Sequence, residues 1–131
     1  MVARAEAPAQ AGVVRAARRP AGWRAPGPAP AGPGTRPDLH PGPGEDLCFL
    51  CGDWRIFQRV GGHRWSLDDL VTAHAAAAAV AAPPARALDL GCGVGSVLMM
   101  VAWRFPAARV VGVEAQPLSA ALARRSLAWN G

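Results

Sequence analysis

The sequence predicts an α/β fold with an incomplete, doubly wound parallel sheet of the Rossmann-like kind. Three observations predict it: an apolar strand (86–91) ends in a glycine-rich turn, a helical stretch (96–105) follows, and a second apolar strand (108–115) leads into a helix (117–130). Strands that alternate with helices are typical of βαβ units with parallel strands. We therefore expect the first βαβα unit of such a sheet within residues 45–131.

Two further elements are expected before the first parallel strand. Residues 46–60 are rich in β-forming side chains, and Gly52-Asp53 interrupts them as a turn, which predicts a hairpin. Residues 66–82 read as a helix that Ser66 caps and that Pro83 ends. Asp69 stands at the third helical position, where its carboxylate completes a capping box.

Apolar spacing predicts which face each helix buries, because side chains three and four positions apart share a helix face. The three expected packed faces are Leu67, Leu70, Val71 and His74; then Val94, Leu98, Val101 and Phe105; then Leu118, Ala121, Leu122 and Trp129. The strand 108–115 is apolar almost throughout, as expected of a parallel strand that is covered on both faces.

Residues 1–44 differ in composition from the rest of the chain. They hold nine of the 13 prolines and seven of the 15 glycines, and six Arg against two acids give a net charge of +4. Residues 45–131 carry eight Arg against seven acids, a net charge of +1. This composition predicts a disordered tail. A basic tail can attract nucleic acid through phosphate neutralisation, or it is a solvated extension without a partner.

The cysteine count and the lack of a secretory segment predict a reducing, cytoplasmic compartment. Three cysteines are present, and the pair in CFLC (48–51) has no second pair with which to form a zinc site, so no metal is expected. No apolar run is long enough to cross a membrane. The Arg-bearing first 25 residues also allow organelle targeting, although they contain no Ser.

The glycine turn indicates the chemistry of a ligand. Gly91, Gly93 and Gly95 alternate before a helix, where glycines let a ligand approach free backbone N–H groups. Glu114 follows Gly91 by 23 residues, near the offset of about 20 at which an acid accepts ribose hydroxyls. The dinucleotide pattern GxGxxG fails at Ser96. Asp89 would repel a pyrophosphate but attract a cationic sulfonium or ammonium group.

These motifs resemble a known family. LDLGCGVG (88–95) followed by VVGVEA (110–115) resembles the first two motifs of class I S-adenosylmethionine-dependent methyltransferases. Within that superfamily, the stretch from 52 to 131 resembles the methyltransferase small domain group and its bacterial tRNA adenine-N6 methyltransferases. The resemblance covers about residues 45–131. It implies S-adenosylmethionine as cofactor, tRNA or another RNA as partner, and a chain that corresponds to the N-terminal portion of such an enzyme.

The resemblance also assigns roles to residues of this sequence. Gly91, Gly93 and Gly95 would line the methionine part of the cofactor, with Cys92 between them as a loop filler. Asp89 would lie near the cofactor's amino group or organise the loop, and Glu114 would bind the ribose. The remaining residues implied at the site are Ala115 and Gln116 beside the adenine and Ser66 and Asp68 at the pocket mouth, where capping alone also explains the last two.

The sequence leaves the methyl acceptor open. The family holds its target amino group with an Asn/Asp-Pro-Pro-aromatic segment after its fourth strand, and this chain has no such segment, so its catalytic residues are unknown. The leading interpretation is the cofactor-binding part of a methyltransferase acting on a nucleic acid base. The alternatives are a catalytically inactive cofactor-binding or regulatory module and, with less support, a fragment of a nucleotide-dependent oxidoreductase.

Overall fold

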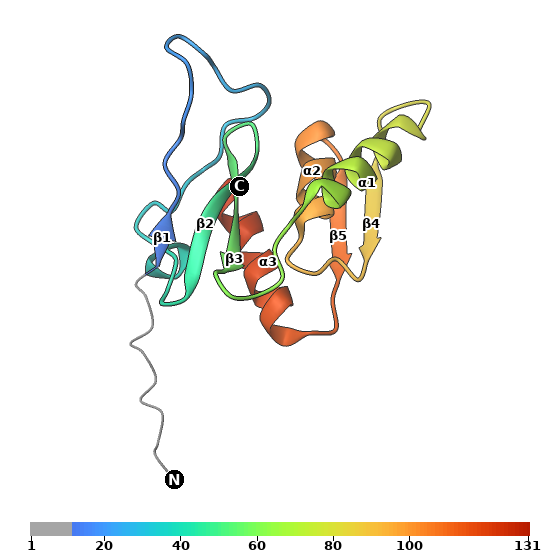
Figure 1. The fold of residues 1–131 in the computed structure, drawn as a ribbon. Coiled ribbons are helices and arrows are strands. Elements are labelled where there is room, and N and C mark those ends of the chain that lie inside the picture. Colours follow the sequence, from blue (N-terminus) through green and yellow to red (C-terminus); the bar gives the residue numbers. More distant parts are fainter. Residues whose placement is uncertain (1–11) are drawn as a thin grey trace, which may run out of the picture.

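The computed structural model describes residues 12–131 and contains two small sheets. The first joins β1 (Val13–Val14), β2 (Glu45–Cys51) and β3 (Trp54–Arg59); the second pairs β4 (Arg86–Leu90) with β5 (Arg109–Val113). The helices are α1 (Leu67–Ala78), α2 (Ser96–Arg104) and α3 (Pro117–Asn130), with a short 3-10 turn at Pro37–Leu39. Helices α2 and α3 lie between the two sheets (Figure 1).

The predicted hairpin is confirmed and forms one side of the core. β2 and β3 pair antiparallel, with Leu47 opposite Phe57 and a register irregularity between Phe49 and Cys51. Ile56 and Phe57 have no exposed surface. They join one apolar cluster with side chains of α2 and α3, so a single core holds the hairpin against both helices.

Polar side chains of α3 complete the free edge of β3. Ser126 Oγ accepts the Phe57 N–H at 2.9 Å. The Asn130 side chain accepts the Arg55 N–H at 2.9 Å and donates to the Arg55 carbonyl at 2.7 Å. The side-chain amide thus takes the place of a neighbouring strand, which satisfies edge groups that burial would otherwise make costly.

These polar contacts explain why the predicted face of α3 is only half right. Leu122 and Trp129 are buried as expected, but Leu118 is 52% exposed and Ala121 is also exposed. The prediction of these last two residues is wrong because Ser126 and Asn130 turn the helix toward β3. The predicted face was chosen from the spacing of apolar side chains alone, so Ser126 and Asn130 were not considered.

Helix α1 starts after Ser66 as predicted and ends at Ala78, four residues before the expected end at 82. The Ser66 N–H donates to the Asp69 carboxylate at 2.8 Å. The predicted packed face is wrong, because its four residues, Leu67, Leu70, Val71 and His74, are exposed. The buried residue is Ala73, whose small side chain lets α1 pack closely on α2.

The parallel pair is confirmed, and it is covered on one face. Leu88 lies opposite Val111 and Leu90 opposite Val113. The predicted stripe of α2 is buried on the covered face, but these four strand side chains are 45–74% exposed on the other. The expectation of a strand buried on both faces is therefore wrong for the described residues. They form a partial Rossmann-like unit with no second helical layer.

Residues 12–44 differ from the disordered tail that the composition predicts. β1 pairs parallel with β2, and the Gly32 N–H donates to the Trp129 carbonyl at 2.8 Å. Leu39 is only 2% exposed, and Arg125 of α3 donates to the carbonyls of Asp38 and His40. A few anchors thus hold this segment on the domain although it lacks apolar periodicity. Residues 1–11, the start of the predicted tail, lie outside the described residues.

Candidate functional site

The candidate site begins with the glycine turn between β4 and α2. Gly91, Gly93 and Gly95 have φ values of 75°, 56° and 87°, a region that other residues rarely adopt. A Cβ atom at Gly91 or Gly93 would meet nothing within 4 Å, so the backbone is open to a ligand at both. The N–H groups of Gly91 and Cys92 donate to the Val113 carbonyl, which ties the turn to the end of β5.

Glu114, which the sequence predicts as the ribose ligand, lies against this turn. Its carboxylate accepts the Gly93 N–H at 2.8 Å and the Gln116 N–H at 2.7 Å. These backbone hydrogen bonds hold the pKa of Glu114 below its ordinary value, so the side chain is ionised at neutral pH. A carboxylate has about four acceptor positions, so two remain for further donors.

Asp89 lies on the face of β4 that α2 covers. One of its carboxylate oxygens is buried and has no hydrogen-bond partner among the described residues. Burial, followed by the nearby negative charge of Asp69, raises the pKa of Asp89. An unpartnered carboxylate oxygen in such surroundings favours a cation or a hydrogen-bond donor.

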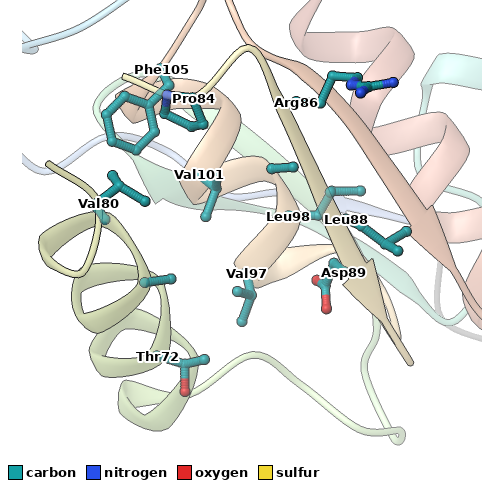
Figure 2. Close-up of a pocket in the computed structure, with 13 residues that line it drawn as sticks. Thr72, Val80, Pro84, Arg86, Leu88, Asp89, Val97, Leu98, Val101 and Phe105 are labelled. Atoms are coloured by element: carbon teal, nitrogen blue, oxygen red, sulfur yellow. The ribbon is translucent and has the colours of Figure 1, made fainter. Parts of the chain in front are cut away.

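A cavity of about 390 Å³ opens at Asp89 between α1, β4 and α2. Figure 2 shows Asp89 and Thr72 toward one end of this cavity, and Val80, Pro84 and Phe105 at the other. The lining is mostly apolar, and its charged side chains are Asp89 and Arg86. A second cavity of about 280 Å³ lies beside Glu114, between β5 and α3.

The remaining predicted site residues occupy less direct positions. Ser66 and Asp68 are exposed at the start of α1, and no hydrogen bond among the described residues joins them to the glycine turn. Asp69, which the sequence indicated only as a cap, lies close enough to Asp89 to raise its pKa. The position of Asp69 in the capping box did not indicate that it would lie near Asp89.

Cys92, Ala115 and Gln116 flank the turn and the end of β5. The Cys92 sulfur lies 2.7 Å from the position that a Cβ of Gly112 would occupy, so Cys92 fills the space above this glycine. Burial, and then the charges of Asp89 and Glu114, raise the pKa of the Cys92 thiol. Ala115 and Gln116 are exposed, and the Gln116 N–H helps to orient Glu114.

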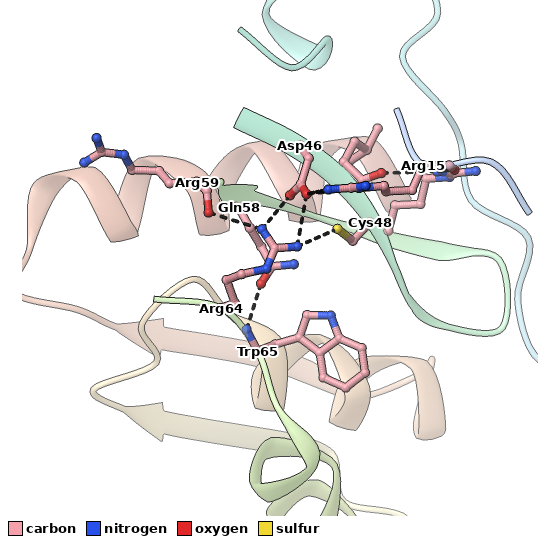
Figure 3. A network of polar contacts seen from close by, with 9 residues as sticks. Arg15, Asp46, Cys48, Gln58, Arg59, Arg64 and Trp65 are labelled. Atoms are coloured by element: carbon pink, nitrogen blue, oxygen red, sulfur yellow. Dashed lines mark hydrogen bonds and ion pairs between the residues drawn. The ribbon is translucent and has the colours of Figure 1, made fainter. Parts of the chain in front are cut away.

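An ion cluster around the buried Asp46 carboxylate, which the sequence did not reveal, supports the segment leading to α1. Figure 3 shows the Arg64 guanidinium between Asp46, Cys48 and the Arg59 carbonyl. Both Arg64 terminal nitrogens lie 3.0 Å from the Asp46 oxygens, and Arg15 reaches the same carboxylate at 2.9 Å. The one sequence signal of this cluster was the position of Asp46, an acid within the apolar strand of the predicted hairpin.

The charge balance of this cluster explains how a carboxylate is tolerated inside the hairpin. The Asp46 side chain has no exposed surface, and burial raises its pKa. Hydrogen bonds from Arg64 and Arg15 outweigh burial and hold the pKa of Asp46 below its ordinary value. The cluster therefore fastens three separate segments of the chain together.

Metal and membrane features are limited in the described part of the chain. Among residues 12–131, no group of three or more His, Cys, Asp or Glu side chains is placed to hold a metal ion. Burial raises the pKa of Cys51 to about 12, so this thiol is protonated at neutral pH. No helix formed by these residues is both long and apolar enough to span a bilayer.

Comparisons with known proteins give short matches. The chain is 47% identical over 45 residues to the tRNA1(Val) (adenine(37)-N6)-methyltransferase of Porphyromonas gingivalis, covering 34% of this chain and 18% of that protein. It is 50% identical over 34 residues to the trans-aconitate 2-methyltransferase of Streptomyces avermitilis, covering 26% of this chain and 13% of that protein. No protein-family profile matches. The matches span less than a fifth of either relative and support the resemblance to S-adenosylmethionine-dependent methyltransferases over about a third of this chain.

Proposed function

We propose that this chain binds S-adenosylmethionine as part of a methyltransferase that acts on the N6 amino group of an adenine in tRNA. One observation carries the cofactor assignment: Glu114 is fixed at the glycine turn by the Gly93 N–H, while Asp89 keeps an unpartnered buried oxygen. The two acids thus flank a turn whose backbone is open to a ligand.

The chemistry of these groups fits S-adenosylmethionine better than a dinucleotide. The free acceptor positions of Glu114 suit the two ribose hydroxyls. The unpartnered oxygen of Asp89 suits the ammonium or sulfonium group. The charge of Asp89 beside the turn would repel the pyrophosphate of NAD, which supports the sulfonium cofactor.

The residues of this chain would act by binding and orienting the methyl donor. When bound, S-adenosylmethionine supplies a methyl group that its sulfonium already activates, so alignment accounts for most of the catalysis. Glu114 holds the ribose, and the glycine turn sets the position of the methionine part. The raised pKa of Cys92 keeps this thiol protonated at neutral pH, which favours packing over a nucleophilic role.

The adenine acceptor rests on the similarity to the tRNA methyltransferase. That relative is named for an adenine-N6 reaction, and its matched segment is the longer of the two described above. A second candidate function is a cofactor-binding module without catalysis, for which the same glycine turn and carboxylates would suffice.

Calorimetric titration of the full chain with S-adenosylhomocysteine and with NAD tests the cofactor assignment. We expect binding of S-adenosylhomocysteine, weakened about 10- to 150-fold in Glu114→Ala, because hydrogen bonds to a charged group contribute about 1.5–3 kcal/mol. Asp38→Asn, which removes an exposed carboxylate paired with Arg36, is the matched control and should leave the affinity unchanged.

Two outcomes contradict the cofactor assignment. One is tighter binding of NAD than of S-adenosylhomocysteine, and the other is equal affinity for S-adenosylhomocysteine in wild type and Glu114→Ala. Transfer of a labelled methyl group to tRNA then separates the two candidate functions. Label on adenine N6 supports the methyltransferase, whereas cofactor binding without transfer supports the module.

A further inference from the structure

The segment between Gly12 and Arg36 concentrates positive charge on the hairpin. It contains five arginines and no acid. Three of them, Arg15, Arg19 and Arg36, form ion pairs with Asp46, Asp53 and Asp38 in that order. Arg18 and Arg24 are exposed, and within residues 12–131 neither makes an ion pair. Two positive charges are therefore available to an external anion.

Arginines and aromatic rings alternate beside these two charges. The Arg19 guanidinium lies 4.6 Å from the ring centroid of Trp23 and 4.9 Å from that of Phe49. The Arg55 guanidinium lies 3.9 Å from the same Phe49 centroid. We call Arg19, Trp23, Phe49 and Arg55 the stacking cluster. Trp23 remains 48% exposed within it, so part of its ring surface is open to solvent.

The hairpin holds the stacking cluster in place. Arg19 pairs with Asp53 at the hairpin turn and donates to the Gly52 carbonyl at 3.0 Å. Arg55 donates to the Arg15 carbonyl at 2.7 Å, which fixes the backbone of the basic segment. Burial, and then the charge of Arg19, lower the pKa of Arg55.

We propose that the stacking cluster, with Arg18 and Arg24, is a docking surface for single-stranded RNA. An exposed Trp offers a face on which an unpaired base can stack, and neighbouring arginines neutralise phosphates. A duplex hides its base faces, and an acidic peptide would use the charges but not the ring. The choice of RNA over DNA rests on the proposed function, which this surface extends to substrate docking.

Fluorescence anisotropy of a labelled 12-nucleotide oligoadenylate RNA tests the surface in the full chain. We expect binding that weakens about 5- to 150-fold in Trp23→Ala, because a stacked base contributes about 1–3 kcal/mol. Trp23→Phe, which keeps a flat ring, should retain most of the affinity. Replacing both Arg18 and Arg24 by Gln should make the salt dependence shallower by about 1.4 logarithmic units per decade of salt.

Arg109→Gln is the control, because it removes one exposed positive charge from β5, in the sheet that does not contain the hairpin. It should leave the affinity and the salt slope unchanged. Affinity for RNA that does not depend on Trp23 overturns the proposal, as do equal effects of Arg109→Gln and of the Arg18 and Arg24 changes. The same holds if oligoglutamate or anionic vesicles displace the RNA as well as unlabelled RNA does, or if a DNA oligomer of the same sequence binds more tightly.

Titration of the same variants with S-adenosylhomocysteine separates this proposal from the proposed function. We expect Trp23→Ala to bind S-adenosylhomocysteine as wild type does, because Trp23 is not among the residues of the glycine turn or its cavities. Loss of RNA binding in that variant with cofactor binding intact supports the surface. Cofactor binding without any RNA binding by the wild type overturns the surface alone.

Discussion

The hairpin and the parallel strand pair differ in how completely they are packed. Ile56 and Phe57 of the hairpin have no exposed surface, whereas Leu88 and Leu90 of the parallel pair are 62% and 74% exposed. Side chains of α3 also satisfy the edge of β3. The difference indicates that the hairpin and α3 supply most of the stability, while the parallel pair presents the glycine turn and its carboxylates.

The largest expected effect comes from removing a buried ring. Phe57→Ala should lower the free energy of unfolding by about 3–5 kcal/mol, because it deletes a fully packed side chain. Leu90→Ala in the parallel pair should change it by less than about 0.5 kcal/mol, since this side chain is mostly in water already. Urea denaturation followed by circular dichroism measures both. Similar losses in the two variants would remove the contrast between the regions.

A smaller effect is expected from Asp46, and it depends on pH. Because Arg64 and Arg15 hold its pKa low against burial, its stabilisation is present above the unfolded value of about 4 and is lost as pH falls through the folded value. Asp46→Asn should cost about 2 kcal/mol at pH 7, less than a fully buried pair, because Arg15 is half exposed. The cost should shrink below about pH 4.

Unfolding free energies of wild type and Asp46→Asn between pH 3 and pH 7 provide the measurement. Asp53→Asn is a control, since its carboxylate is partly exposed and, within residues 12–131, pairs with Arg19 alone. A difference between wild type and Asp46→Asn that stays constant over this pH range would show that the charge of Asp46 contributes nothing.

The smallest expected effect concerns Asp89, where the change to Asn should raise the free energy of unfolding rather than lower it. Burial and the charge of Asp69 raise its pKa, so ionisation destabilises the folded state above the folded pKa. This cost is relieved as pH falls through that value and is gone below the unfolded pKa of about 4. Asp89→Asn should therefore raise stability at pH 7 by less than about 1 kcal/mol, since the group is only partly buried.

Thermal unfolding of wild type and Asp89→Asn at pH 7 and pH 3 tests this sign. At pH 3 the two should unfold alike. We expect the variant to bind S-adenosylhomocysteine more weakly although it is more stable at pH 7, because a ligand site commonly carries such a cost. A variant that is less stable at pH 7 would contradict a carboxylate whose ionised form is destabilised by burial at this position.

The sequence predicted the elements well because each carries a local signal. Gly52-Asp53 marked the hairpin turn, Ser66 marked the start of α1, and Pro117 marked the first turn of α3. The alternating glycines and the spacing to Glu114 indicated a shared ligand site, and the structure places Glu114 against the glycine turn through the Gly93 N–H. Short-range backbone preferences decide the hairpin turn and the starts of α1 and α3.

Features that depend on distant partners could not be predicted in the same way. The burial of Asp46 requires Arg15 and Arg64, which lie 31 and 18 residues away. The orientation of α3 depends on Ser126 and Asn130 meeting the edge of β3, a tertiary contact with no periodic signature. Helix periodicity alone could not show which layers cover the faces of the parallel pair.

Amide hydrogen exchange, followed by NMR with and without S-adenosylhomocysteine, tests the division between the two regions most directly. Without ligand, the amides of Arg55 and Phe57 should exchange among the slowest, because α3 side chains accept their hydrogen bonds inside the stable half. Saturating ligand should add protection at residues 91–97 and 114–116. Added protection on the hairpin instead, or none at the glycine turn, would contradict a cofactor site built by the parallel pair.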